Sequence, residues 1–147
     1  MKREIKYRGM DIMTDEWVYG YAVFDGFAAY IVPIDKPFRK EPEIPQPMNW
    51  IEVDELSVGE FTGLLDKQDK EVYEDDVVVQ EHWNGGDNMT EPSETYTFEG
   101  SVVWHCGGFG IQTPICEGEG TEVNLCKGDE YTKVEVIGNV HSNPELL

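Results

Sequence analysis

The chain of 147 residues has no stretch of ten or more residues in which apolar side chains recur at helical spacing without an intervening glycine or proline. An amphipathic helix needs that spacing to bury one face, so a helical layer architecture is disfavoured. Short apolar runs separated by glycine-rich turns occur instead, and these are typical of strands. The fold class that we predict is mainly β: antiparallel sheets with a barrel-like core and few or short helices.

The clearest strand signals lie before residue 35. Two runs, Trp17-Val18-Tyr19 and Tyr21-Ala22-Val23-Phe24, precede a third from Phe27 to Ile34, and Asp25-Gly26 between the last two is a typical hairpin turn. These runs predict a small antiparallel sheet. Further short strands are expected near residues 50–53, 58–65, 72–73, 77–79, 96–104, 109–113, 122–125 and 133–140.

Five prolines between residues 33 and 47 mark the best candidate for an internal boundary. Proline lacks the amide donor that a sheet needs, so we expect an extended connector over 33–47. The length of the chain fits one domain, 1–147, which would subdivide into an N-terminal β-sheet segment, 1–39, and a barrel-like part, 48–147. The sequence leaves open whether the connector separates two domains or joins two parts of one.

Charge is unevenly distributed along the chain. The 11 Lys and Arg residues stand against 30 Asp and Glu residues, a net charge of -19, and residues 1–39 contribute none of it. Such a surface repels phosphates, so we expect no direct binding to nucleic acid or to membranes. The charged amino terminus has no apolar stretch behind it, which favours a cytoplasmic protein. The acidic part either keeps the protein soluble or forms an interaction surface.

Cysteine and histidine spacing gives no sign of a metal site. The three cysteines lie ten residues apart, and zinc sites usually begin with a much closer pair. We expect reduced thiols, no metal ligands and no cofactor. A cysteine–histidine nucleophile would depend on the fold to bring such a pair together. The residues concerned are Cys106, Cys116, Cys126, His82, His105 and His141.

Carboxylates gather between residues 66 and 76, at Asp66, Asp69 and Glu74-Asp75-Asp76. Convergent carboxylates can hold the metal of a hydrolase, so a metal-dependent hydrolase using Asp66, Asp69, Glu74 and Asp76 is one alternative. The simpler interpretation places consecutive acids at a turn before Val77, pointing outward into solvent. We therefore assign no catalytic residue.

Four tryptophans and seven tyrosines could stack on nucleic-acid bases, but that use requires a basic groove. The segment 77–130 has a single basic residue, Lys127, so we expect the aromatic side chains to be core and interface anchors. The tryptophans are Trp17, Trp50, Trp83 and Trp104.

Three segments of the chain form a recognisable combination. They are the opening Arg3-Glu4-Ile5-Lys6-Tyr7-Arg8 with Trp17-Val18-Tyr19-Gly20, the central Phe61-Thr62-Gly63-Leu64-Leu65-Asp66-Lys67 through Lys70-Glu71-Val72-Tyr73-Glu74-Asp75-Asp76-Val77-Val78, and the terminal Glu135-Val136-Ile137-Gly138-Asn139-Val140-His141-Ser142-Asn143-Pro144-Glu145-Leu146-Leu147. In these segments the chain resembles the YopX family, small proteins typical of bacteriophages and prophages. The resemblance implies a mainly β fold with a barrel-like core and supplies no activity.

Two turns depart from the pattern of that family. It usually has Asn-Gly where this chain has Gln68-Asp69, and Glu-Gly-Asp where this chain has Glu74-Asp75-Asp76. If the second glycine serves a positive backbone angle, Asp75 is a tolerable substitute, because Asp adopts that region at modest cost.

Together these observations favour a small accessory protein of a phage or prophage that works by binding a host or phage protein, or by self-assembly, rather than by catalysis. A sharper alternative is an acidic mimic of DNA that blocks a host DNA-binding protein, since a charge of -19 attracts basic clefts. The metal-dependent hydrolase is the alternative from a different class.

Overall fold

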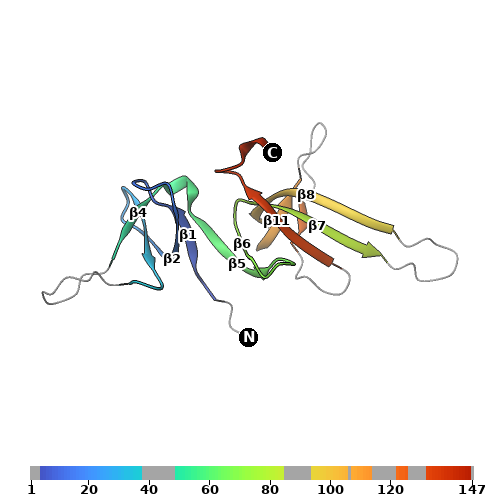
Figure 1. Ribbon diagram of the computed structural model, residues 1–147, viewed down its shortest axis with the longest axis horizontal. Helices are drawn as coiled ribbons and strands as arrows, with labels where there is room; N and C mark the ends of the chain where they lie inside the picture. The colour runs from blue at the N-terminus through green and yellow to red at the C-terminus, as the bar shows by residue number, and fades with distance from the viewer. Residues whose placement is uncertain are drawn as a thin grey trace, which may run out of the picture. The chain divides into compact units, whose positions relative to one another are not determined.

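The computed structural model describes residues 4–37, 49–84, 94–105, 107–113, 122–125 and 132–146. These residues form antiparallel strands and two single-turn 3-10 helices (Figure 1), which confirms the prediction of a mainly β fold. None of the described helices is long and apolar enough to cross a membrane. The elements are β1 Tyr7–Met10, β2 Trp17–Phe24, β3 Ala29–Pro33, β4 Ile51–Val53, η1 Glu55–Ser57, β5 Gly59–Leu65, β6 Glu71–Tyr73, β7 Asp76–Asn84, β8 Glu94–His105, β9 Gly108–Gln112, β10 Glu122–Asn124, β11 Thr132–Asn139 and η2 Pro144–Leu146.

The chain divides into two compact units, Met1–Phe61 and Thr62–Leu147, and the division falls inside β5. It does not coincide with the proline-rich segment, most of which, 38–48, lies outside the described residues. The division of the chain into domains therefore stays a prediction. The first unit has 12 acidic and 7 basic residues, a net charge of -5, and the second has 18 and 4, a net charge of -14.

The predicted hairpin of the first unit is confirmed. Strands β2 and β3 pair from Gly20 with Pro33 to Phe24 with Ala29. The turn between them is built on Asp25, whose Oδ1 accepts hydrogen bonds from the backbone N–H groups of Phe27 (2.8 Å) and Ala28 (2.9 Å). These bonds lower the pKa of Asp25. The loop occupies residues 25–28, so it is longer than a two-residue turn.

The sheet of the first unit is strongly curled but open. Its strands run β4-β3-β2-β1, and β5 follows β1. Just after β1, Asp11 forms an isolated bridge with Val53, and Asp54 N–H donates to the carbonyl of Met10 at 2.9 Å. The close approach requires Gly9, because a Cβ there would lie 2.7 Å from the Val53 side chain. The core consists of Ala29, Ile31 and Val53 with partly buried neighbours.

The predicted barrel-like core is therefore wrong in one respect: neither sheet closes into a barrel. Closure needs a full ladder between the first and last strands. In the first unit a single bridge forms, because β4 has three residues and a turn starting at Asp11 ends β1. In the second unit the described strands run β10-β9-β8-β7-β11, and β10 and β11 are not paired with each other.

The second unit packs one face of its five-stranded sheet against β6. The core is Val72 of β6 with Val78, Val102, Ile111 and Val134 of the sheet. Cross-strand register brings these side chains together, since Val78 is opposite Val136, Val102 is opposite Ile111, and alternate residues of a strand share a face. The hairpin of β7 and β8 extends beyond the other strands (Figure 1).

Gly100 of β8 and Gly108 of β9 provide a matched test of backbone packing in this sheet. A Cβ on Gly100 would lie 2.1 Å from the carbonyl oxygen of Gln112, whereas a Cβ on Gly108 would meet nothing within 4 Å. We expect Gly100→Ala to lower the free energy of unfolding by about 2 kcal/mol, and Gly108→Ala to change it by less than about 0.5 kcal/mol. Urea unfolding followed by tryptophan fluorescence measures both; equal effects would contradict the close approach at Gly100.

Candidate functional site

One face of the first unit's sheet is lined by aromatic side chains. Ile31 of the core and the partly buried Val18 and Ala22 lie on one face, so the alternating residues of the same strands lie on the opposite face, where Val32 is buried opposite the exposed Tyr21. The cross-strand partners agree, since Tyr19 is opposite Arg8 and Val23 is opposite Tyr30. We call this the aromatic face and define it by Arg8, Trp17, Tyr19, Tyr21, Tyr30 and Trp50.

The side chains of the aromatic face are ordered by contacts with one another, and they differ in exposure: Arg8 is buried, Trp17 and Tyr30 are half-buried, and the other three are exposed. The Arg8 guanidinium lies over the ring of Trp17, 4.5 Å from its centroid, and the rings of Tyr30 and Trp50 meet at 5.7 Å. Tyr19 is 45%, Tyr21 55% and Trp50 42% exposed. Tyrosine and tryptophan held in this way offer large contact area with little loss of side-chain entropy.

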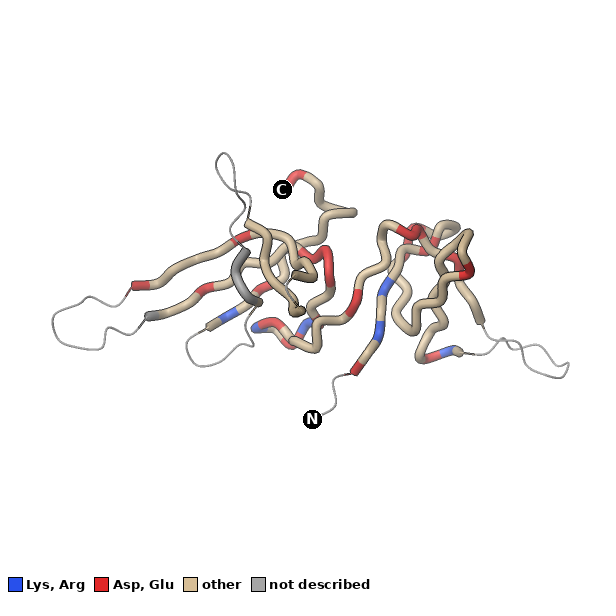
Figure 2. The backbone as a smooth tube through the Cα atoms, turned by 180° about the vertical axis from the view of Figure 1, so that it is seen from behind, with Lys and Arg blue, Asp and Glu red and all other residues tan. Residues whose placement is uncertain are grey.

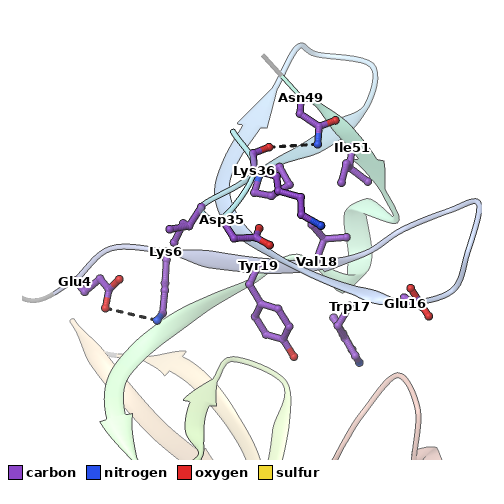
Figure 3. A pocket seen from close by; sticks show the side chains of 12 residues that line it. Glu4, Lys6, Glu16, Trp17, Val18, Tyr19, Asp35, Lys36, Asn49 and Ile51 are labelled. Atoms are coloured by element: carbon purple, nitrogen blue, oxygen red, sulfur yellow. Dashed lines mark hydrogen bonds and ion pairs between the residues drawn. The ribbon is translucent and has the colours of Figure 1, made fainter. Parts of the chain in front are cut away.

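A pocket of about 620 Å³ opens beside the aromatic face, within the first unit (Figure 3). Its lining shares Trp17 and Tyr19 with that face. The buried Lys6 contributes its ammonium group, which lies 3.5 Å from the Glu4 carboxylate and 4.6 Å from the centroid of the Phe61 ring. The remaining lining residues are Glu16, Val18, Pro33, Ile34, Asp35, Lys36, Asn49 and Ile51. Such mixed charged and apolar walls suit the side chains of another protein.

The carboxylate of Asp66 holds the turn between β5 and β6. Its Oδ1 accepts hydrogen bonds from the N–H groups of Gln68 (2.7 Å) and Lys70 (3.0 Å), and its Oδ2 accepts one from Val136 of β11 (3.2 Å). Burial raises the pKa of Asp66, but the backbone hydrogen bonds outweigh it, so the pKa lies below its ordinary value. Beside it, Lys67 forms an ion pair with Glu135, which raises the pKa of Lys67.

The other carboxylates predicted for a hydrolase do not join Asp66. Asp76 is 1% exposed and accepts a hydrogen bond from Tyr73 N–H (2.8 Å), whereas Asp69 is exposed. In the part of the chain that the structure describes, no three His, Cys, Asp or Glu side chains are grouped to hold a metal. The expectation that the acids before Val77 are all solvated is wrong for Asp76, because its carboxylate serves the adjacent backbone.

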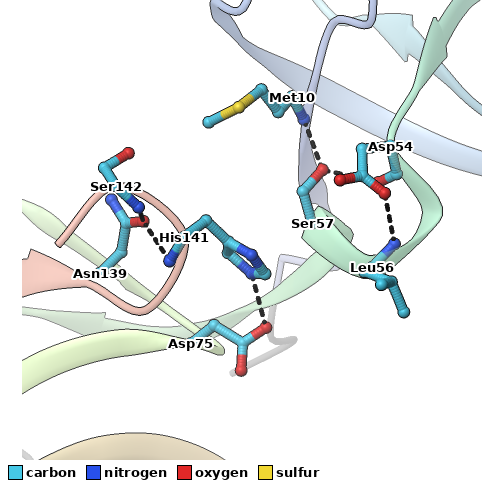
Figure 4. Close-up of polar contacts among 8 residues, drawn as sticks. All are labelled: Met10, Asp54, Leu56, Ser57, Asp75, Asn139, His141 and Ser142. Carbon is cyan, nitrogen blue, oxygen red and sulfur yellow. Dashed lines mark hydrogen bonds and ion pairs between the residues drawn. The ribbon is translucent and has the colours of Figure 1, made fainter. Parts of the chain in front are cut away.

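The central and terminal segments meet at Asp75 and His141. Asp75 Oδ2 lies 3.1 Å from His141 Nε2 (Figure 4). Asp75 O also accepts a hydrogen bond from Val140 N–H at 2.9 Å. Asn139 Oδ1 accepts from His141 N–H (3.1 Å) and Ser142 N–H (2.8 Å) and so shapes the terminal turn. A Cβ on Gly138 would lie 2.6 Å from Leu146, which explains the glycine.

Both departures from the usual turn glycines are accounted for. Asp75 has φ 63° and Asp69 has φ 62°, so each Asp stands in the left-handed region that favours glycine. The inference about Asp75 is confirmed. Aspartate is among the residues that adopt this region at least cost.

The cysteines lie outside the described residues, so the predictions for Cys106, Cys116 and Cys126 stay predictions. Of the histidines, His82 Nδ1 lies 3.0 Å from Thr132 Oγ1, and His141 contacts Asp75. His105 ends β8 and is exposed.

The tryptophans are surface residues rather than core residues. Trp50, Trp83 and Trp104 are between 42% and 52% exposed, Trp17 is half-buried, and neither hydrophobic core contains a tryptophan. The expectation that they anchor the core is thus wrong. The alternation of Trp17, Tyr19 and Tyr21 in the sequence could have indicated one shared face, but not which face is buried.

The model of a known family, described as YopX protein, matches residues 6–147. The chain belongs to the YopX family. Its structure is similar to the crystal structure of protein EF1440 from Enterococcus faecalis, with a TM-score of 0.53 and 20% sequence identity over 99% of each chain. That similarity shows a shared fold. Among curated proteins, none matches this sequence at a significant level.

Asp66 supplies a test of what the central motif of the YopX family does. Both carboxylate oxygens of Asp66 accept hydrogen bonds from backbone N–H groups, and asparagine replaces one of these oxygens with an NH2 group that cannot accept. We therefore expect Asp66→Asn to lower the free energy of unfolding by about 2 kcal/mol at pH 7. Because the pKa of Asp66 is lowered by folding, its contribution is present above the unfolded pKa of about 3.9 and disappears as pH falls through the folded value.

The measurement is urea unfolding of both proteins between neutral and acidic pH. Asp69→Asn is the matched control, because Asn also adopts positive φ and the Asp69 side chain is exposed; it should stay within about 0.5 kcal/mol of the parent. A difference between Asp66→Asn and the parent that persists unchanged in acid would contradict this account.

Proposed function

We propose that this YopX protein works by binding proteins, either a second copy of itself or another partner, through the aromatic face of its first unit. The observation that carries the proposal is the gathering of Trp17, Tyr19, Tyr21, Tyr30 and Trp50 on one face of one sheet. Interfaces are enriched in tyrosine, tryptophan and arginine, and their energy concentrates in a few such residues.

The distribution of exposed apolar side chains supports this choice of unit. Of the 15 large hydrophobic residues exposed in the described chain, ten lie in Met1–Phe61 and five in Thr62–Leu147. The first unit is also the less acidic of the two, at -5 against -14. It therefore repels a second protein less strongly and offers more apolar area to bury.

The described carboxylates also favour binding over catalysis. Asp66 and Asp76 accept backbone hydrogen bonds, and the Asp75 carboxylate contacts His141. These contacts have a structural purpose. The metal-dependent hydrolase consequently has no observation in its favour, and we do not propose it.

A second candidate function is the acidic mimic of DNA, favoured by the charge of the second unit. Acidic positions recur along its strands (Figure 2), and β7 and β8 contain no Lys or Arg. Such a surface would occupy the basic cleft of a DNA-binding protein. The mimic predicts binding that falls steeply with salt and is displaced by duplex DNA. Binding through the aromatic face predicts salt-tolerant association instead.

We expect the protein to self-associate in sedimentation velocity experiments at rising concentration, and Tyr21→Ser to weaken that association about tenfold. Loss of a half-exposed tyrosine from the centre of an interface removes roughly 1–2 kcal/mol, which corresponds to that factor.

Phe27→Ser is the control, because Phe27 is 97% exposed in the β2–β3 turn and does not belong to the aromatic face. It should leave association unchanged. A wild-type protein that stays monomeric at every concentration would refute self-assembly and leave only a different protein as the partner.

A further inference from the structure

The first half of β8 has an edge that no described strand covers. β8 pairs with β7 from Glu94 to Ser101, whereas β9 pairs only with Ser101–His105. Among the described residues, none pairs with Glu94–Glu99 on the side away from β7. We call this stretch, Glu-Thr-Tyr-Thr-Phe-Glu, the β8 edge. Uncovered strand edges are sites where another chain can add a strand.

Contacts at the outer edge of β11 show which of its backbone N–H and C=O groups point away from β7 and which point toward it. Lys67 N–H donates to Val134 O at 2.8 Å, and Val136 N–H donates to Asp66 Oδ2 at 3.2 Å. These contacts lie on the side of β11 away from β7. Because backbone groups of successive residues in a strand point to alternate sides, Glu135 directs its backbone groups toward β7.

The same alternation carries across β7 to β8. Glu135 is opposite Val79, so the backbone N–H and C=O groups of Val79 point toward β11. The backbone groups of the neighbouring Gln80 therefore point toward β8, where Gln80 is opposite Phe98. Phe98 therefore directs its backbone groups to β7. Thr95 and Thr97, at the alternate positions of β8, direct their N–H and C=O groups away from β7, toward the uncovered side.

The side chains of the β8 edge suit a strand partner. Thr95, Thr97, Tyr96 and the partly buried Phe98 are β-branched or aromatic residues, which pair well across strands. Glu94 and Glu99 stand at the two ends of the edge and are exposed. β7 and β8 together contain no Lys or Arg, so nothing on these strands neutralises the two carboxylates.

Charge decides between the occupants of the edge. Pairing with a second copy would bring Glu94 and Glu99 of the two copies close together along the paired strands. It would also place the second units of the two copies, each with a net charge of -14, side by side. A segment with basic residues at its ends meets the same carboxylates favourably. We propose that the β8 edge binds an extended, basic segment of a partner protein by strand addition. This site is in the second unit and is independent of the aromatic face.

The test uses the full chain and a short capped peptide of alternating Val and Thr with Lys at each end, labelled for fluorescence anisotropy. We expect binding, and about tenfold weaker binding of the same peptide with Glu in place of Lys. A third peptide has the Lys residues and N-methylated central amides. It retains the charge but cannot donate to the edge, so it should also bind about tenfold more weakly.

Thr97→Pro tests the protein side. It removes an N–H that points away from β7, and proline is tolerated on edge strands at such positions, so we expect the fold to persist and peptide affinity to fall about tenfold. Thr97→Val retains the N–H and should bind within about twofold of the parent. Urea unfolding checks the fold of both variants.

The outcomes separate strand addition from simple charge attraction. Equal binding of the N-methylated and unmodified peptides would overturn the proposal, because both carry the same charge. Absence of binding by the basic peptide would overturn it as well, and so would full affinity in a folded Thr97→Pro protein. If Thr97→Pro does not fold, the N-methylated peptide decides with the unaltered chain.

Discussion

The Asp66 carboxylate is the interaction on which the second unit most depends. It fixes the β5–β6 turn through Gln68 and Lys70, and it caps the outer edge of β11 through Val136. The neighbouring Lys67 N–H bonds to Val134 O on the same edge. One side chain therefore joins a local turn to a strand about 70 residues later and protects an edge that would otherwise be open.

Two of the three segments that resemble the YopX family, the central and the terminal one, meet around this scaffold. Asp75, in the turn before β7, bonds through its backbone to Val102 and Val140 and contacts His141 through its carboxylate. Gly138 makes room for the terminal turn. These residues lie far apart in sequence and hold one structure. Their contacts explain the central and terminal segments as requirements of the fold. The similarity to EF1440, at 20% sequence identity, is likewise a similarity of fold.

Function is consequently to be sought on surfaces that the scaffold leaves open. The aromatic face of the first unit and the β8 edge of the second are two such surfaces, and they differ in chemistry. The first offers the apolar area of exposed tyrosine and tryptophan side chains, and salt has little effect on contacts of that kind. The second offers backbone donors between two carboxylates and selects a basic strand. A protein with both could contact two partners, or one partner twice.

The sequence by itself determined the mainly β class, the hairpin at Asp25 and the tolerance of Asp75 for a positive backbone angle. Each of these follows from local periodicity or from the conformational preference of a single residue. Tertiary structure alone decided that the sheets stay open, that Asp76 is buried, that the tryptophans lie at the surface, and that β11 is capped while no described strand covers the β8 edge. These features depend on register between distant strands, because shifting a strand by one residue exchanges its buried and exposed faces.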